Sequence, residues 1–152
     1  MKVLADTNIL IDYLCRRHPF DEEAKFILFG CAMGDYELWI SSSQVTDLFF
    51  LLTHGAGCLS AQEARGVLQQ LRKYVRVGSL REEDVDAALD CSWKDFEDAC
   101  VHQVARHLKC DYLVTRNEAD FEKPTLHVLS PKQFLNLLGE QQQIFYSEIS
   151  LT

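Results

Sequence analysis

The chain has 152 residues, 47% hydrophobic and 25% charged, which is long enough for one domain with a substantial core and short for two. Its formal net charge of −8 argues against binding of nucleic acid through an overall positive charge. A polyanionic substrate would therefore need a positive charge near its binding site. No apolar run reaches membrane-spanning length, and the six cysteines show no metal-ligand spacing and follow no secretory leader. We therefore expect a cytoplasmic protein with reduced thiols and no membrane partner.

Short apolar strands alternate with amphipathic helices along the chain. Apolar spacing predicts strands at 2–5, 37–40, 74–77, 112–114 and 126–129. Periodicity and capping residues predict helices at 9–14, 21–33, 45–55, 60–74 and 81–89, one between 92 and 111, and one from Pro131. Strands separated by helices imply parallel pairing with right-handed crossovers. We expect one α/β domain over 1–139, with a mainly parallel sheet of about five strands between helical layers, and a tail over 140–152 with no assigned role.

Four aspartates fall near the carboxyl ends of predicted strands, where open parallel sheets bind ligands. Asp6 ends the first strand, and Asp47 lies in the first turns of the helix after the second. Asp98 lies in the first turn of the helix before the fourth strand, and Asp120 follows that strand. Each has a simpler explanation alone: an N-cap for Asp6, the helix dipole for Asp47, acid enrichment of a helix start for Asp98, and an ordinary loop acid for Asp120.

Together, these carboxylates would repel one another at one sheet edge unless a cation were present. Oxygen ligands without cysteine or histidine spacing favour Mg²⁺ or Mn²⁺ over Zn²⁺. Such an ion suits hydrolysis of a phosphodiester by a metal-activated water. Helical periodicity does not decide between Asp98 and Glu97, because Glu97 lies nearer the centre of the apolar stripe.

Four blocks of the chain resemble PIN-domain nucleases, in particular the VapC-like toxins of bacterial type II toxin–antitoxin pairs. The blocks are ADTNILIDYL, SSSQVTDLFFLL, DFEDACVHQVARHLKCDYLVTRNEADF and VLSPKQFL, in the family's order. The resemblance implies a three-layer α/β/α sandwich and a Mg²⁺- or Mn²⁺-dependent endoribonuclease. It also implies an RNA substrate, a small antitoxin that covers the site, and a homodimer.

The resemblance assigns roles position by position. It gives the four catalytic acids as Asp6, Asp47, Asp98 and Asp120, and thereby chooses Asp98 over Glu97. Metal ligands are Asp6, Asp98 and, through water, Asp120. The supporting polar residues are Thr7, Asn8, Thr115 and Asn117, and Arg116 is a candidate contact to an RNA phosphate. Many relatives have glutamate where Asp47 stands. The aspartate side chain is shorter and reaches less far, so the resemblance does not decide whether a second metal ion binds.

Two other classes of function use the same kind of fold. In one, the protein is a non-catalytic regulatory or binding module whose acidic pocket takes a cation or a basic side chain of a partner. In the other, a phosphatase or receiver-like module would use Asp6 as nucleophile. The phosphatase needs a second acid where Asn8 stands, and the receiver needs a lysine on the late strand that Thr115 ends, so both fit poorly.

Overall fold

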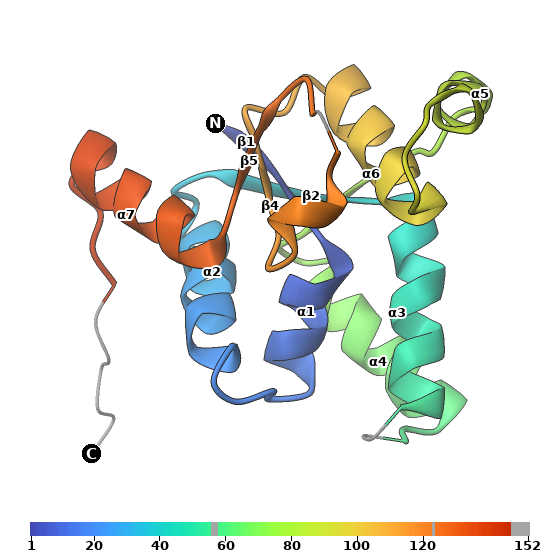
Figure 1. Ribbon diagram of the computed structural model, residues 1–152. Coiled ribbons are helices and arrows are strands. Elements are labelled where there is room, and N and C mark those ends of the chain that lie inside the picture. Colours follow the sequence, from blue (N-terminus) through green and yellow to red (C-terminus); the bar gives the residue numbers. More distant parts are fainter. Residues whose placement is uncertain (56–57, 123, 147–152) are drawn as a thin grey trace, which may run out of the picture.

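The computed structural model describes residues 1–55, 58–122 and 124–146, in which strands and helices alternate as predicted (Figure 1). The strands are β1 (Lys2–Ala5), β2 (Glu37–Ser41), β3 (Arg76–Gly78), β4 (Tyr112–Val114) and β5 (His127–Leu129). The α-helices are α1 (Thr7–Leu14), α2 (Asp21–Met33), α3 (Ser42–His54), α4 (Ala61–Leu71), α5 (Glu82–Asp90), α6 (Phe96–His107) and α7 (Pro131–Gln142). One 3₁₀ turn, η1 (Glu118–Asp120), follows β4.

The strands form one parallel sheet in the order β3-β2-β1-β4-β5. The chain builds outward from β1 to β3 and then crosses over to build β4 and β5 on the other side of β1. The direction of winding therefore reverses between β1 and β4, and this is the point at which open α/β sheets bind ligands. Backbone pairing continues beyond these strands, since Asp6 N donates to Val114 O at 2.9 Å and Thr115 N donates to Leu129 O at 3.0 Å.

Helices cover both faces of the sheet, which confirms the predicted three-layer α/β/α sandwich (Figure 1). Val3 and Ala5 of β1 point into the larger core cluster, which includes side chains of α1, α2, α3, α4 and α7. Leu4 points to the opposite face and packs against α6. α5 packs in turn on α6 through Ala88 and Ala99. Alternation of side chains along β1 thus supplies apolar surface to both layers.

Local capping signals fix where several helices begin and end. The hydroxyl of Ser60 accepts a hydrogen bond from Glu63 N at 3.1 Å, and that of Ser130 accepts one from Gln133 N at 3.2 Å. Both are capping boxes, so α4 and α7 begin where predicted. Gly34 ends α2 with φ of 84°, a left-handed conformation that glycine adopts without steric cost.

The C-terminal part differs from the predicted boundary at residue 139, because α7 continues to Gln142. After the helix the chain packs back on the core, where Ile144 and Tyr146 contact the larger cluster. The Tyr146 hydroxyl donates to the Asp35 carboxylate at 2.5 Å. Residues 140–146 therefore belong structurally with the domain, while 147–152 of the predicted tail lie outside the described residues.

The cysteine thiols are the next feature to compare with the sequence. All six cysteines are free, and Cys31, Cys100 and Cys110 are buried.

The helix predicted to end at residue 74 and the strand predicted to begin there are separated by a turn. α4 ends at Leu71 and β3 begins only at Arg76. A hydrogen bond of 2.8 Å from Arg72 Nη1 to Val75 O closes this turn. Within the part of the chain that the structure describes, no helix has the length and apolar character needed to cross a bilayer.

Candidate active site

Asp6 lies at the carboxyl end of β1 and is the N-cap of α1, with 7% of its surface exposed. One carboxylate oxygen accepts a hydrogen bond of 2.7 Å from Thr7 N. The other accepts from Asn8 Nδ2 at 2.9 Å and from the Thr115 hydroxyl at 2.7 Å. These donors fix the orientation of the carboxylate, and all three are neutral, so they leave its charge without a counter-charge.

Thr115 joins the two halves of the sheet at the reversal between β1 and β4. Its hydroxyl donates to Asp6 and also accepts from Asn8 Nδ2 at 3.2 Å and from Asn117 N at 3.0 Å. The predicted supporting residues Asn8, Thr115 and Asn117 are therefore connected in one network. Thr7 contributes its backbone N–H to Asp6, and its hydroxyl accepts from Gln44 Nε2 at 3.2 Å.

Four carboxylates line one open cleft of about 230 Å³ at this sheet edge. They are Asp6 after β1, Asp95 and Asp98 at the start of α6, and Asp120 in η1. The other lining residues are Thr7, Asn8, Ile11, Arg17, Leu51 and Asn117. The tertiary structure thus brings Asp6, Asp98 and Asp120 together from three separate segments, whereas their chemical roles remain predictions.

Burial and neighbouring negative charges both disfavour ionisation of the carboxyl groups in the cleft. Burial, followed by the charges of Asp6 and Asp95, raises the pKa of Asp98 to about 7. Burial and, more weakly, the charges of Asp120 and Asp95 raise the pKa of Asp6 above its usual value, against the opposing effect of its hydrogen bonds. Carboxyl groups that resist ionisation for these reasons are stabilised in the charged form by a bound cation.

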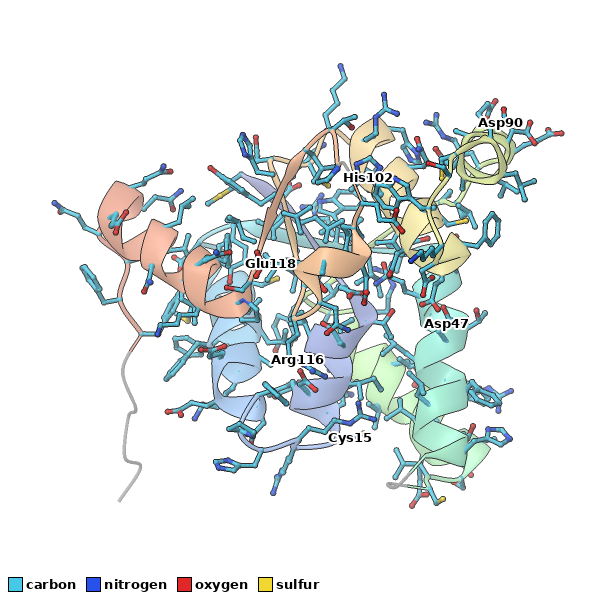
Figure 2. The ribbon with its side chains drawn as sticks, in the orientation of Figure 1. Cys15, Asp47, Asp90, His102, Arg116 and Glu118 are labelled. Carbon is cyan, nitrogen blue, oxygen red and sulfur yellow. The ribbon has the colours of Figure 1, made fainter. Side chains whose placement is uncertain are left out.

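Asp47 is not among the residues that line the cleft. It lies on α3, on the part of the helix nearest the start of α6 (Figure 2). Burial, followed by the charge of Asp47 and a side-chain hydrogen bond to it, raises the pKa of Glu97 to about 7, with a smaller contribution from Asp6. Asp47 and Glu97 therefore form a carboxyl pair beside the cleft, while Asp98 faces into it. The role of Asp98 as the catalytic acid, in preference to Glu97, stays a prediction.

The donor set suits a hard divalent cation by its chemistry. Asp6, Asp98 and Asp120 offer carboxylate oxygens, the ligands that Mg²⁺ and Mn²⁺ prefer. Within residues 1–55, 58–122 and 124–146, no three histidine, cysteine, aspartate or glutamate side chains are arranged to hold a metal ion. The carboxylates would therefore have to draw closer together around the ion, with water completing its shell.

Arg116, the candidate phosphate contact, has partners within the protein. Its guanidinium forms a bidentate ion pair with Asp12, from Nε at 2.5 Å and from Nη2 at 3.1 Å. It also lies over the ring of Phe20, 4.1 Å from the centroid. Figure 2 shows Arg116 beside α1. The guanidinium is thus occupied by a structural ion pair, and its contact with RNA stays a prediction that this geometry does not favour.

Sequence reasoning did not select three residues that shape this region. Asp95 is the N-cap of α6 and accepts from Asp98 N at 3.1 Å, and its place at the start of DFED was the available signal. Gln44 is fully buried and donates to Ala5 O at 2.9 Å, and the pattern Ser-x-x-Gln after β2 marks it as a capping box. Asp12 carries no local signal, because its partner is distant in sequence.

Comparison with known families identifies the domain. A family model described as "PIN domain" matches residues 2–119. The chain belongs to the PIN-domain family. Among curated proteins, no significant match is found. The resemblance inferred from DTN, DFEDA and TRN-x-x-DF is thereby confirmed, and the cleft described above lies within the matched residues except for Asp120, which follows immediately.

Solved toxin–antitoxin structures share this PIN fold. VapBC2 from Rickettsia felis, bound to a promoter DNA fragment, contains a chain with 14% identity and a TM-score of 0.63, covering 86% of this chain and 98% of that one. A chain of a toxin–antitoxin complex from Klebsiella pneumoniae has 23% identity and a TM-score of 0.57, and the match covers 85% of this chain and 97% of that one. VapC20 of Mycobacterium tuberculosis is described as a toxin that cleaves the sarcin–ricin loop. It has 17% identity and a TM-score of 0.57, and the match covers 73% of this chain and 86% of that one. At these identities the similarity establishes the fold.

Proposed function

We propose that this PIN-domain protein is a divalent-metal-dependent endoribonuclease that acts as the toxin of a toxin–antitoxin pair. The observation that carries the proposal is the convergence of Asp6, Asp98 and Asp120 on one cleft at the reversal of the sheet. The raised pKa values of Asp6 and Asp98 support a cation there, because burial and, to a smaller extent, neighbouring carboxylates disfavour the charged forms that a cation would stabilise.

The protein's own residues would bind and orient the reacting groups. Asp6 and Asp98 would hold Mg²⁺ or Mn²⁺ directly, and Asp120 would hold it through water. When bound, such an ion supplies Lewis acidity and an activated water for phosphodiester hydrolysis. Thr115 and Asn8 keep the Asp6 carboxylate in one orientation, as the outer-shell partners of a metal ligand do.

The toxin assignment is supported by the kinds of protein that share the fold. Two of the similar structures are toxin–antitoxin complexes, and another toxin is described as cleaving the sarcin–ricin loop. By extension, we propose an RNA substrate, a small antitoxin that covers the cleft, a homodimeric assembly and a cytoplasmic location. The negative charge of the cleft would suit a basic antitoxin side chain.

Cleavage of a cellular RNA pool, with the fragment ends mapped, tests the proposal. We expect cleavage with Mn²⁺, none with EDTA, and loss of cleavage in Asp98→Asn. Asp90→Asn is the matched control, because Asp90 is exposed on α5 and lies well away from the cleft (Figure 2). Equal cleavage by Asp98→Asn and the wild type would contradict the assigned site.

A non-catalytic binding module is a second candidate, favoured by two observations. No three potential ligands in the described residues are arranged to hold a metal ion, and neutral donors already satisfy the Asp6 carboxylate. Calorimetric titration with Mn²⁺ separates the two functions. Metal binding that depends on Asp98, without cleavage of any RNA in the pool, would favour the module.

A further inference from the structure

Two arginines lie near the acidic cleft, and their side chains have different surroundings. Arg17 lines the cleft directly, in the connection between α1 and α2. Arg116 instead directs its guanidinium to Asp12 and Phe20. Sequence position alone favours Arg116 as a ligand for phosphate, because it directly follows the site residue Thr115.

The backbone of Arg17 is fixed by both neighbouring helices. Its N–H donates to Asp12 O at 2.9 Å, within the last turn of α1. Its carbonyl accepts from Phe20 N at 2.9 Å and from Asp21 N at 3.0 Å, where α2 begins. These contacts hold the residue beside the cleft while it remains exposed to solvent. Among the salt bridges of the described residues, none involves Arg17.

Arg17 is the one cationic residue among the described residues that line the cleft, opposite four carboxylates. An RNA strand that approaches this cleft brings further negative charge to a protein whose net charge is already −8. A guanidinium can bind two phosphate oxygens at once, and it remains charged at all physiological pH values. We propose, resting on the proposed ribonuclease function, that Arg17 binds a backbone phosphate of the RNA beside the cleavage site and that Arg116 does not.

The Asp12 ion pair explains why Arg116 is unavailable for this contact. Both of its participating nitrogens bond to Asp12, whose side chain is 1% exposed. Turning the guanidinium towards RNA would leave Asp12 as an unpaired buried charge, which is strongly unfavourable. Arg116 therefore acts as a positioning residue for the loop after β4, and Arg17 remains available to the substrate.

Steady-state RNA cleavage with Mn²⁺, measured at several KCl concentrations, tests this assignment. We expect Arg17→Gln to raise KM about tenfold, since a charge-assisted hydrogen bond is lost, with a much smaller change in kcat. The slope of log(kcat/KM) against log[KCl] should become shallower by about 0.7, the value for one phosphate of a single strand. Arg17→Lys should restore the slope and part of the affinity, because it restores the charge without the planar fork.

Arg16→Gln is the matched control, because Arg16 is exposed, is adjacent in sequence and is not among the residues lining the cleft. It removes the same charge and should leave KM and the salt slope close to those of the wild type. Equal effects of Arg16→Gln and Arg17→Gln, or no effect of Arg17→Gln, would overturn the inference and leave the ribonuclease function standing. Absence of cleavage by the wild-type protein would instead overturn both.

Arg116→Gln adds a second control, because it separates substrate binding from stability. We expect it to lower the midpoint of thermal unfolding and to leave the salt slope unchanged. A shallower salt slope in Arg116→Gln, with unchanged thermal unfolding, would assign the phosphate contact to Arg116 and overturn the inference.

Discussion

Two buried aspartates, one at the N-cap of α1 and one within the helix, are stabilised in opposite ways. Asp12 is fully buried and paired with the guanidinium of Arg116. Asp6 is 7% exposed and receives hydrogen bonds from neutral donors. The protein therefore neutralises the charge of Asp12 with an arginine and leaves the charge of Asp6 without a counter-charge.

Position on the helix explains part of this contrast. Asp6 caps the N-terminus of α1, where the helix dipole favours a negative charge, whereas Asp12 lies in the last turns, where the dipole opposes one. Asp12 therefore needs an arginine for stability. Asp6 also lines the same cleft as Asp95, Asp98 and Asp120, and no arginine pairs with it among the salt bridges of the described residues.

The largest expected effect comes from breaking the Asp12 ion pair. Asp12→Asn leaves Arg116 largely buried without a counter-charge, and breaking such pairs costs about 3–5 kcal/mol of unfolding free energy. Urea denaturation measures the loss. Arg76→Gln is the control, because the Arg76–Glu37 pair is 58% and 38% exposed and such pairs contribute about 1 kcal/mol or less. Equal losses in the two variants would remove the contrast between buried and exposed pairs.

The next prediction concerns Asp6→Asn, which should reduce RNA cleavage with Mn²⁺ by more than about 100-fold, since outer-shell changes alone cost 10–100-fold. In the absence of metal, its stability should stay close to that of the wild type. Asparagine also caps helices and removes the repulsion, but its NH₂ group faces donors that now bond to a carboxylate oxygen. Cleavage should therefore fall while urea unfolding changes little. A variant that loses both would make Asp6 a structural residue like Asp12.

A smaller effect is expected from Thr115→Val, which removes one of the donors that orient Asp6. We expect cleavage to fall about tenfold, as for other residues that orient a metal ligand, and the unfolding free energy to fall by about 1 kcal/mol. Thr53→Val is the control, because its hydroxyl bonds to Phe49 O within α3 at 2.9 Å. If Thr53→Val reduces cleavage as much as Thr115→Val does, the Thr115 network has no special role.

The last prediction concerns a dependence of stability on pH without metal. The pKa of Asp98 is about 7 in the folded protein, above its ordinary value of 3.8, so the folded state holds more protons between these two pH values. The unfolding free energy contributed by Asp98 should therefore decrease as pH rises from about 4 to 7. Thermal unfolding across this range measures it, with Asp98→Asn as the comparison. Mg²⁺ should oppose this decrease, because it stabilises the ionised form of the Asp98 carboxyl. An identical pH profile in Asp98→Asn would contradict the raised pKa.

The site residues show how far sequence reasoning extends. Asp6 and Asp98 follow from position relative to the strands and from family motifs, and both face the cleft. Asp47 was expected beside them, but it lies outside the cleft lining and acts on Glu97. Its position on α3 was predictable, whereas the direction of its side chain depends on how α3 packs near the start of α6.

The sequence by itself determined the order of strands and helices along the chain and several helix caps, because apolar periodicity and capping act between residues close along the chain. Only the tertiary structure decided which charges are neutralised and which are left open. Arg116 and Asp12 are separated by 104 positions in sequence, so no local pattern reveals their pairing. That pairing depends on β4 lying beside β1, and among the described residues that line the acidic cleft it leaves Arg17 as the cationic one.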